Sequence, residues 1–277
     1  MVETIDQRWR FDGKRVVVTG CASGIGACVV TQLRSLGAEI VGLDLLRPAT
    51  ELDEFYELDQ ADPESIERAA RKVGPGVDAL FNIAGVSSGI GDPLRVVTIN
   101  FLGLRYFTEA VVPQMSPGSA VVSVSSLAAS GYLEHRWSVN GLLETASMAE
   151  GIDWCAAHPE AIADGGYRLS KEAIVLYTVR RSVELAARGI RMNCTGPGVT
   201  ETPILDQLRT AYGQEYLDGI PKPLGRAADP VEQAAALLFL NSRAAGYITG
   251  QVLWVDGGNL AGRLAQELAG PVPADIE

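Results

Sequence analysis

The sequence reads Thr19-Gly20-Cys21-Ala22-Ser23-Gly24-Ile25-Gly26 directly after the β-branched run RVVVT at residues 15–19, and a stretch with helical periodicity follows at 24–36. Three glycines thus stand where a chain that leaves a strand must turn sharply and pass close to a pyrophosphate. The first turn of the helix offers free N–H groups and the positive end of its dipole. This stretch predicts a strand–turn–helix unit that cradles a dinucleotide.

Short β-branched runs alternate with longer amphipathic stretches along the rest of the chain, which is the pattern of repeated βαβ units. Strands are predicted at 15–19, 39–43, 55–58, 79–83, 120–124, 190–194 and 251–255. Helices are predicted at 24–36, 63–73, 99–112, 166–187 and 230–240. We therefore expect an α/β protein with a doubly wound Rossmann fold, a seven-stranded parallel sheet with helices on both faces.

We expect residues 1–277 to form a single domain with its core at about 11–258, a loose arm before residue 11 and an acidic tail at 260–277. The segments 132–164 and 200–223 are longer than the connections need to be, and both follow strands whose ends carry candidate site residues. They are predicted to form a lid over a bulky, apolar substrate, the alternative being packing on the domain or on a neighbouring subunit. The apolar side chains behind this prediction are Leu133, Trp137, Leu142, Leu143, Met148 and Trp154, then Ile204, Leu205, Leu208, Tyr212 and Tyr216.

The composition excludes several classes of function. The net charge is −11, from 34 acidic and 23 basic side chains, so a nucleic-acid backbone would be repelled. No run of about 18 apolar residues and no leader-like start is present, which predicts a cytoplasmic protein without a membrane span. The 4 cysteines and 2 histidines show no metal-ligand spacing, so no metal site is expected and the cysteines are interpreted as reduced structural thiols.

Asp44 stands at the end of the second predicted strand, near the spacing at which a carboxylate accepts hydrogen bonds from an adenosine ribose. The same carboxylate would repel a 2′-phosphate, which favours NAD over NADP. Arg47 is the residue that could reverse this preference. The alternative reading is a glycine-rich turn followed by an ordinary surface aspartate.

Tyr167 and Lys171 are four residues apart in a helical stretch and so share one face. An ammonium near a phenol favours the phenolate and lowers its pKa from about 10, as a general acid/base requires. Ser126, at the end of the strand at 120–124, is predicted to hold a substrate oxygen beside the phenol. Its neighbour Ser125 is the alternative for that position.

Taken together, the Gly-x-x-x-Gly-x-Gly turn and the Tyr-x-x-x-Lys pair resemble those of the short-chain dehydrogenase/reductase family, with similarity from about residue 11 to 258. Further matching motifs are Asn82-Ile83-Ala84-Gly85, Asn100 within Ile99-Asn100-Phe101-Leu102-Gly103, Pro197-Gly198-Val199-Thr200-Glu201-Thr202, Tyr247-Ile248-Thr249-Gly250-Gln251 and Val255-Asp256-Gly257-Gly258. Ile83 departs from the family pattern, which has a second asparagine there.

The resemblance implies an oxidoreductase in which Tyr167 exchanges a proton with the substrate oxygen and Ser126 positions that oxygen. Lys171 would bind the nicotinamide ribose and Asn100 would hold a water that relays the proton. The implied cofactor-binding residues, with NAD as the cofactor, are Gly20, Ser23, Gly24, Ile25, Gly26, Asp44, Asp59, Gln60, Asn82, Ala84, Gly85, Tyr167, Lys171, Pro197, Gly198, Val199 and Thr202.

Segment 132–164 separates Ser126 from Tyr167, where family members usually have a short connection. With the turn and loop motifs, it makes the chain similar to the bacterial 3α-hydroxysteroid dehydrogenase/carbonyl reductases and coniferyl-alcohol dehydrogenases. The expected partner is a small-molecule substrate, a bulky apolar alcohol or ketone, whose CH–OH or C=O group would react. The alternatives are a non-catalytic NAD-sensing relative, an NADP-preferring carbonyl reductase, and a nucleotide-sugar epimerase or dehydratase on a related scaffold.

The two histidines, His135 and His158, both lie in segment 132–164 and could bind substrate or carry protons, although packing roles are commoner for such residues. The resemblance also implies a homo-oligomer, a dimer or a tetramer, formed through the helices that carry Asn100 and Tyr167. The apolar residues expected on that outer face are Val175, Leu176, Val179 and Val183.

Overall fold

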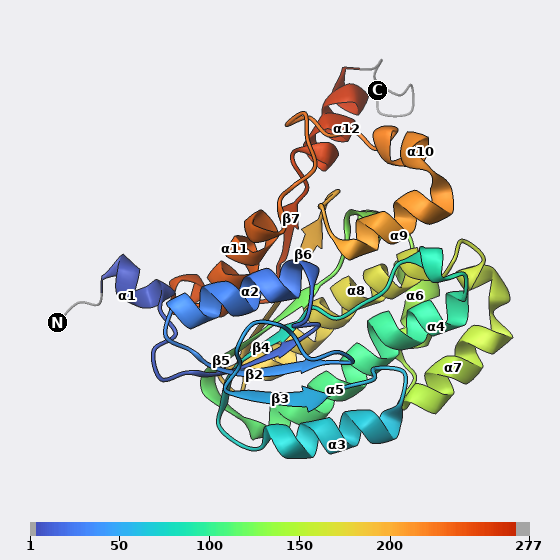
Figure 1. Cartoon of the computed structure of the whole chain (residues 1–277). Coiled ribbons are helices and arrows are strands. Elements are labelled where there is room, and N and C mark those ends of the chain that lie inside the picture. Colours follow the sequence, from blue (N-terminus) through green and yellow to red (C-terminus); the bar gives the residue numbers. More distant parts are fainter. Residues whose placement is uncertain (1–3, 270–277) are drawn as a thin grey trace.

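Seven parallel strands form one sheet in the order β3-β2-β1-β4-β5-β6-β7 in the computed structural model, which describes residues 4–269 (Figure 1). The strands are β1 (Arg15–Thr19), β2 (Glu39–Asp44), β3 (Glu54–Glu57), β4 (Val77–Asn82), β5 (Met115–Val124), β6 (Arg191–Pro197) and β7 (Val252–Val255). The strand order reverses between β1 and β4, and ligands of doubly wound folds bind beyond the carboxyl ends at such a point. The predicted fold class is confirmed.

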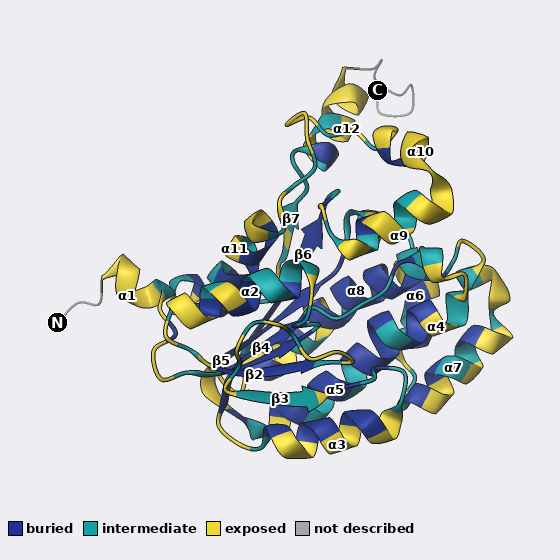
Figure 2. Cartoon of the chain, viewed as in Figure 1, coloured by how far each residue is buried: buried dark blue, intermediate teal, exposed yellow. Residues whose placement is uncertain are grey.

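Helices cover both faces of the sheet because each strand is followed by a crossover that must bury an apolar stripe. One face carries α2 (Gly24–Ser35) and α11 (Pro230–Asn241), and the other carries α3 (Pro63–Val73), α5 (Leu104–Val111) and α8 (Tyr167–Ala186). A buried apolar cluster fills each layer between the sheet and its helices. Figure 2 shows the helices buried along the side that faces the sheet and exposed on the other.

The helix expected at 99–112 begins earlier, as α4 (Pro93–Val97), and passes through a π-helical stretch, η2 (Thr98–Gly103), into α5. A π-helical turn inserts a residue into the α-helical repeat and is common at functional sites. Asn100 lies in this stretch. The backbone here leaves no space for a side chain at Gly103, where a Cβ would lie 2.0 Å from the carbonyl oxygen of Gln60.

The two ends of the described chain are helical, where a loose arm and a tail were expected. Helix α1 (Ile5–Trp9) starts at a capping box formed by Thr4 and Gln7, and the Trp9 ring packs at 5.4 Å against Phe239. Helix α12 (Asn259–Leu268) continues the chain beyond β7. The rest of the predicted tail, residues 270–277, lies outside the described residues.

Segment 132–164 folds into α6 (Arg136–Leu143), α7 (Met148–Ala157) and the short 3-10 helix η5 (Pro159–Ile162). Val139 and Leu142 of α6 are fully buried in the core beside α8. Trp137, in contrast, is 76% exposed on the outer side. The segment therefore extends the helical layer beside α8 instead of forming a loop.

Segment 200–223 forms α9 (Pro203–Tyr212) and α10 (Gln214–Asp218), which lie above the carboxyl ends of the strands together with α12 (Figure 1). Two hydrogen bonds join α9 to the turn after β4. The Ser87 hydroxyl donates to Gln207 Oε1 at 3.1 Å, and the Tyr212 hydroxyl donates to Ser88 Oγ at 3.0 Å. Side chains of α9 and α10 thus form a roof above that edge of the sheet.

Candidate active site

A cavity of about 600 Å³ opens at the carboxyl ends of the central strands, beneath α9 and α10. Nearly all residues predicted to bind a dinucleotide line it. They are Gly20, Ser23, Gly24, Ile25, Gly26, Asp44, Asp59, Gln60, Ala84, Gly85, Pro197, Gly198, Val199 and Thr202. Ser126, Tyr167 and Lys171 line the same cavity, so the predicted cofactor and catalytic residues converge on one space.

The glycine-rich turn is packed so closely that side chains cannot enter it. Gly20 has φ +71°, and a Cβ there would lie 2.7 Å from the backbone of Ala84. A Cβ on Gly26 would lie 1.9 Å from the Gly20 carbonyl oxygen. Ser23, the residue before α2, makes no side-chain cap, so the first N–H groups of the helix stay free to bind an anion. The turn therefore fits a pyrophosphate.

Asp44 presents its carboxylate to the cavity at the end of β2. Its Oδ2 accepts a hydrogen bond of 3.0 Å from Ala22 N, and its Oδ1 accepts one of 3.2 Å from Leu46 N. Two backbone donors thus hold the carboxylate in place, with lone pairs left over for ribose hydroxyls. The guanidinium of Arg47 lies over the Phe55 ring, 5.4 Å from its centroid, and does not line the cavity.

Asp59 and Gln60 are held against the adjacent wall of the cavity. Asp59 Oδ1 accepts a hydrogen bond of 2.8 Å from Ala61 N, and Gln60 Nε2 donates one of 2.9 Å to the carbonyl oxygen of Ile99. On the opposite side, the loop after β6 lies against the glycine turn, since a Cβ on Gly24 would be 3.4 Å from Thr202 Cγ2. The cavity is thus closed around the turn from two sides.

Ser126 and Tyr167 meet at the inner end of the cavity, where β5 ends and α8 begins. A hydrogen bond from the Ser126 hydroxyl lowers the pKa of the Tyr167 phenol, but burial raises it more strongly. An electrostatic interaction with Tyr216 of α10, which lines the same cavity, raises the pKa of the phenol further. Ser126 therefore occupies the predicted position beside Tyr167.

Lys171 lies one turn after Tyr167 on the same helix, as the spacing predicted. Its Nζ donates a hydrogen bond of 3.0 Å to the carbonyl oxygen of Val124 and lies 5.5 Å from the centroid of the Tyr167 ring. Burial lowers the pKa of Lys171 to about 8. Burial is the largest cause that raises the pKa of the Tyr167 phenol, and the lowering by Lys171 that was expected from the sequence does not contribute to this shift.

The side chain of Asn100 is fully buried and does not line the cavity. Its Oδ1 accepts a hydrogen bond of 2.8 Å from Val86 N, and its Nδ2 donates one of 2.9 Å to Val86 O. A Cβ on Gly85 would lie 3.0 Å from Asn100 Oδ1 and 3.6 Å from Lys171 Nζ. Asn100 thus braces the turn after β4 and approaches Lys171 across Gly85.

Comparison with known proteins agrees with this geometry. The family model for short chain dehydrogenase matches residues 14–138, and that for Enoyl-(Acyl carrier protein) reductase matches residues 155–259. A coniferyl-alcohol dehydrogenase from a Pseudomonas species is 37% identical over 250 residues, covering 90% of this chain and 97% of that protein. The chain belongs to the short-chain dehydrogenase/reductase family.

This short-chain dehydrogenase/reductase is also similar to a second curated protein and to a solved structure. The 3-alpha-hydroxysteroid dehydrogenase/carbonyl reductase of Comamonas testosteroni is 30% identical, over 88% of this chain and 95% of that protein. A crystal structure of the 3-alpha-hydroxysteroid dehydrogenase from a Pseudomonas species, complexed with NADH, matches with a TM-score of 0.78 at 31% identity. That match covers 91% of this chain and 99% of the other.

Asn82 is the cofactor-binding prediction that the structure does not support. This residue of the short-chain dehydrogenase/reductase is buried behind the cavity and does not line it. Its Nδ2 donates hydrogen bonds to Thr108 Oγ1 at 2.9 Å and to Ser123 Oγ at 3.3 Å. Because its amide is directed between the sheet and α5, Asn82 holds the end of β4 and has no contact with the space for a dinucleotide.

Segment 132–164 was expected to cover the substrate, and the structure does not place it at the cavity. No residue of the segment lines the cavity. Several of its apolar side chains pack on the helical layer, with Leu142 and Met148 in the core, whereas Leu133 and Trp137 are exposed. Neither histidine reaches the cavity: His158 Nδ1 lies 2.8 Å from Trp154 O, and His135 Nδ1 lies 2.6 Å from Glu172 Oε1.

Segment 200–223 does line the cavity, as predicted, and it provides most of the apolar wall at the substrate end. Sequence reasoning missed several other lining residues that come from elements next to it. The side chains around this end are Val86, Ser88, Arg95, Leu127, Ser130, Ile204, Leu205, Gln207, Leu208, Tyr216, Leu217, Ile220 and Arg263. The amphipathic repeat of residues 259–268 could have revealed α12, which contributes Arg263 and had been assigned to the tail.

Other kinds of site find little support in the described residues 4–269. No three His, Cys, Asp or Glu side chains gather there as metal ligands. No helix within that range is long and apolar enough to cross a membrane. Burial raises the pKa of the Cys21 and Cys194 thiols to about 12, so neither is held as a reactive thiolate.

Proposed function

We propose that this protein is an NAD-dependent dehydrogenase or reductase that interconverts a bulky, largely apolar secondary or aryl alcohol and its carbonyl form. The observation that carries this proposal is the Ser126–Tyr167 hydroxyl pair in the same cavity as the glycine-rich turn. A proton donor or acceptor next to a dinucleotide cradle is the arrangement that alcohol oxidation and carbonyl reduction require.

The protein's own part of the reaction is alignment and proton transfer. Ser126 would hold the substrate oxygen by a hydrogen bond, and the Tyr167 phenol would give or take its proton. Lys171 would bind the nicotinamide ribose, and with Asn100 on the other side of Gly85 it is placed to pass the proton onward. A bound nicotinamide would supply the hydride chemistry, which no side chain of the protein can perform.

The preference for NAD rests on Asp44. Its backbone-held carboxylate can accept hydrogen bonds from a ribose but repels a 2′-phosphate at the same position. Arg47, the residue that could favour NADP, is occupied by its contact with Phe55. The related hydroxysteroid dehydrogenase crystallised with NADH, which supports the same cofactor here.

The substrate class rests on the apolar roof. Leu205, Leu208, Tyr216 and Leu217 give the substrate end a surface suited to an aromatic or steroid body. The names of the relatives, a coniferyl-alcohol dehydrogenase and 3-alpha-hydroxysteroid dehydrogenases, agree with such a body. We therefore expect hydroxysteroids and aryl alcohols such as coniferyl alcohol to be the best substrates.

Tyr167→Phe tests the proposal. The variant should lose at least 10²-fold in kcat, measured by NADH absorbance, because it lacks the proton-transfer group, while NADH binding measured by fluorescence changes little. Tyr106→Phe is the matched control, since the Tyr106 hydroxyl donates a hydrogen bond of 2.8 Å to Glu67 Oε1 between α5 and α3 and does not line the cavity. A Tyr167→Phe enzyme with more than about a tenth of the wild-type kcat would exclude Tyr167 as the base. Wild-type protein that binds NADH but turns over no alcohol or ketone would favour an NAD sensor.

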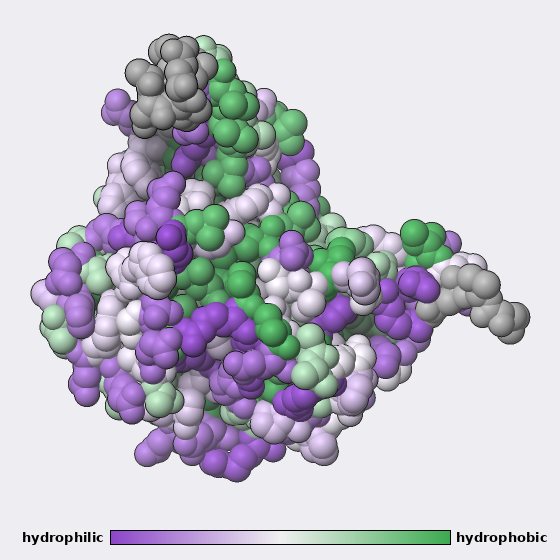
Figure 3. All heavy atoms as spheres, turned by 180° about the vertical axis from the view of Figure 1, so that it is seen from behind, coloured by the Kyte–Doolittle hydropathy of each residue, from purple (hydrophilic) through white to green (hydrophobic). Residues whose placement is uncertain are grey.

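We also propose that the protein forms a homo-oligomer. Val179 and Val183 lie exposed on α8, as expected, whereas Val175 is fully buried in the core and cannot contribute to an outer face. Apolar side chains also gather on the side of the molecule shown in Figure 3. Sedimentation at micromolar concentration should give a dimer or tetramer, and a monomer would contradict the proposal.

A further inference from the structure

Glu172 is a fully buried carboxylate that the proposed chemistry does not use. It directly follows Lys171 on α8, and its side chain has no exposed area. Arg168 Nη1 donates a hydrogen bond of 2.9 Å to Glu172 Oε2. His135 Nδ1 lies 2.6 Å from Glu172 Oε1, and because a carboxylate can only accept, Nδ1 is the donor.

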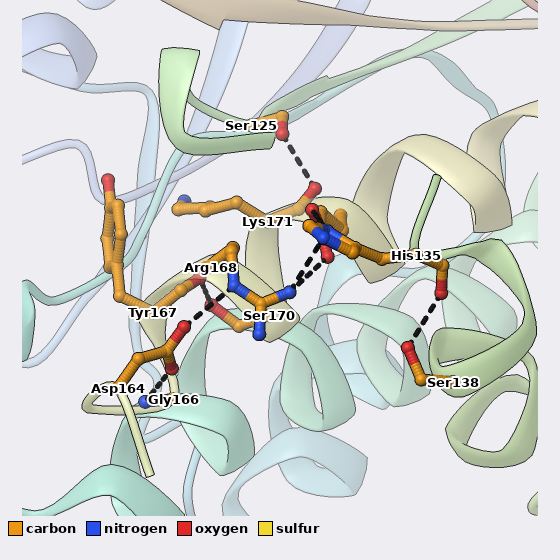
Figure 4. A network of polar contacts seen from close by, with 10 residues as sticks. Ser125, His135, Ser138, Asp164, Gly166, Tyr167, Arg168, Ser170 and Lys171 are labelled. Carbon is orange, nitrogen blue, oxygen red and sulfur yellow. Dashed lines mark hydrogen bonds and ion pairs between the residues drawn. The ribbon is translucent and has the colours of Figure 1, made fainter. Parts of the chain in front are cut away.

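These contacts reach both ends of segment 132–164. His135 stands directly before α6, and its ring covers Gly131, where a Cβ would lie 3.0 Å from His135 Cε1 and 3.5 Å from Glu172 Oε1. At the other end, Asp164 Oδ2 accepts a hydrogen bond of 2.7 Å from Arg168 Nε. Asp164 Oδ1 also accepts one of 3.3 Å from Gly166 N, the residue before α8 (Figure 4).

Two residues of this network are direct sequence neighbours of the candidate catalytic residues on α8. Arg168 follows Tyr167 and Glu172 follows Lys171, so each member of the i,i+4 pair in the cavity has a neighbour in the network. The short helix η4 (Leu127–Ala129) directly follows Ser126 and leads to Gly131. One buried carboxylate therefore connects the loop after Ser126 to the start of the helix that carries Tyr167.

We propose that Glu172 and His135 are positioning residues that hold the Ser126 loop and the first turn of α8 in register, so that the Ser126 hydroxyl stays bonded to the Tyr167 phenol. This inference rests on the proposed function. It assigns segment 132–164 the role of a brace on the catalytic helix, in place of a lid.

A buried carboxylate is costly unless its partners are complete, so this network has one well-defined arrangement. Within residues 4–269, the charged or titratable side chains that contact Glu172 or His135 are Arg168 and these two residues themselves. Asp164 reaches the group only through Arg168. Removing either Glu172 or His135 therefore loosens the loop without exposing the cavity.

The test compares Glu172→Gln and His135→Ala with wild type in single-turnover alcohol oxidation over a range of pH. Both variants should lose about 10- to 100-fold in rate, the cost of small misplacements between reacting groups, with NADH binding unchanged. His135→Asn should recover part of the rate, since its amide can donate to Glu172. His135 is partly exposed, so its variants remain usable if Glu172→Gln does not fold.

The direction of the pH shift separates positioning from a direct effect of charge. Removing the Glu172 charge alone would stabilise the phenolate and move the rising limb of the rate profile to lower pH. Loss of the Ser126 hydrogen bond removes the interaction that lowers the pKa of Tyr167, so positioning predicts a shift to higher pH in both variants.

Arg180→Ala is the matched control, because Arg180 joins α8 to Glu144 at the end of α6 by an exposed ion pair of 2.8 Å. It should leave the rate and its pH profile unchanged. Glu172→Gln and His135→Ala enzymes with wild-type rates and profiles but lower melting temperatures would overturn the inference. Wild-type protein without any turnover would instead overturn the proposed function on which it rests.

Discussion

The hydroxyl of Ser125 donates a hydrogen bond of 2.7 Å to the main-chain carbonyl oxygen of Lys171. Ser125 is buried and joins the end of β5 to α8, while the next residue, Ser126, bonds the Tyr167 phenol. Both serines line the cavity, but the Ser125 hydroxyl is used by the Lys171 carbonyl, whereas the Ser126 hydroxyl is bonded to the phenol. The pair thus divides into a structural and a substrate-facing hydroxyl.

Replacing these serines one at a time should separate the two roles. Ser126→Ala should lower kcat for alcohol oxidation by about 100-fold or more, because it removes a donor aimed at the reacting oxygen. Ser125→Ala should keep most of kcat and lose about 1 kcal/mol of stability, the usual contribution of one buried hydrogen bond. Steady-state kinetics and urea unfolding of both variants give the answer, and the reverse pattern would assign the site to Ser125.

Asp44→Ala should weaken NAD and relax the discrimination against NADP. The lost interactions are hydrogen bonds from ribose hydroxyls to a charged acceptor, so the KM for NAD should rise about tenfold or more. The KM for the alcohol at saturating cofactor should change little. If wild-type protein uses NADP with the higher kcat/KM, the assignment of Asp44 is wrong, and Arg47→Ala should then reduce that activity.

Leu208 and Trp137 were both predicted to contact the substrate, and the structure separates them. Leu208 lines the cavity, whereas Trp137 is exposed on the outer side of α6. Leu208→Ala should raise the KM for the best bulky alcohol about tenfold, as expected for lost methylene contacts in an apolar pocket, with NAD affinity unchanged. Trp137→Ala serves as its control and should match wild type; equal kcat/KM in the wild type and Leu208→Ala would contradict the roof assignment.

Lys171 links stability to pH through its burial, which lowers its pKa from 10.5 to about 8. Because the folded-state value is the lower one, the unfolded chain binds more protons between these two pKa values. The charged ammonium therefore destabilises the fold most below about pH 8. The free energy of unfolding increases as the pH rises from about 8 to 10.5.

Lys171→Met should consequently stabilise the cofactor-free protein by about 2 kcal/mol at pH 7, after allowing for the lost hydrogen bond to Val124, while turnover is lost. The gain should shrink as the pH rises above 8, which urea unfolding at several pH values can measure. Lys72→Met, at an exposed position on α3, should show no such gain. A gain that stays constant from pH 6 to 10 would argue against a buried ammonium.

Segment 132–164 shows where sequence patterns stop being informative. Its length and its apolar residues marked it as an addition at the mouth of the site, but the same side chains suit a lid and a packed helical layer equally. Leu142 and Trp137 are both apolar residues of this segment, and the sequence does not distinguish them. Only the packing of α6 on α8 buries Leu142 and leaves Trp137 exposed. Burial is decided by contacts between elements far apart along the chain, which local periodicity does not contain.

The sequence by itself determined the parallel α/β fold, the glycine-rich turn, Asp44 at the end of β2 and the Tyr167–Lys171 pair, because each depends on backbone geometry within a few residues. The hydrogen bond of Ser125, the alternative to Ser126, to the Lys171 carbonyl and the position of Asn82 outside the cavity came only from the tertiary structure. So did the raised pKa of Tyr167 and the connection of His135 to Glu172. These depend on which groups meet across elements and how far water is excluded from them, and both follow from packing in three dimensions.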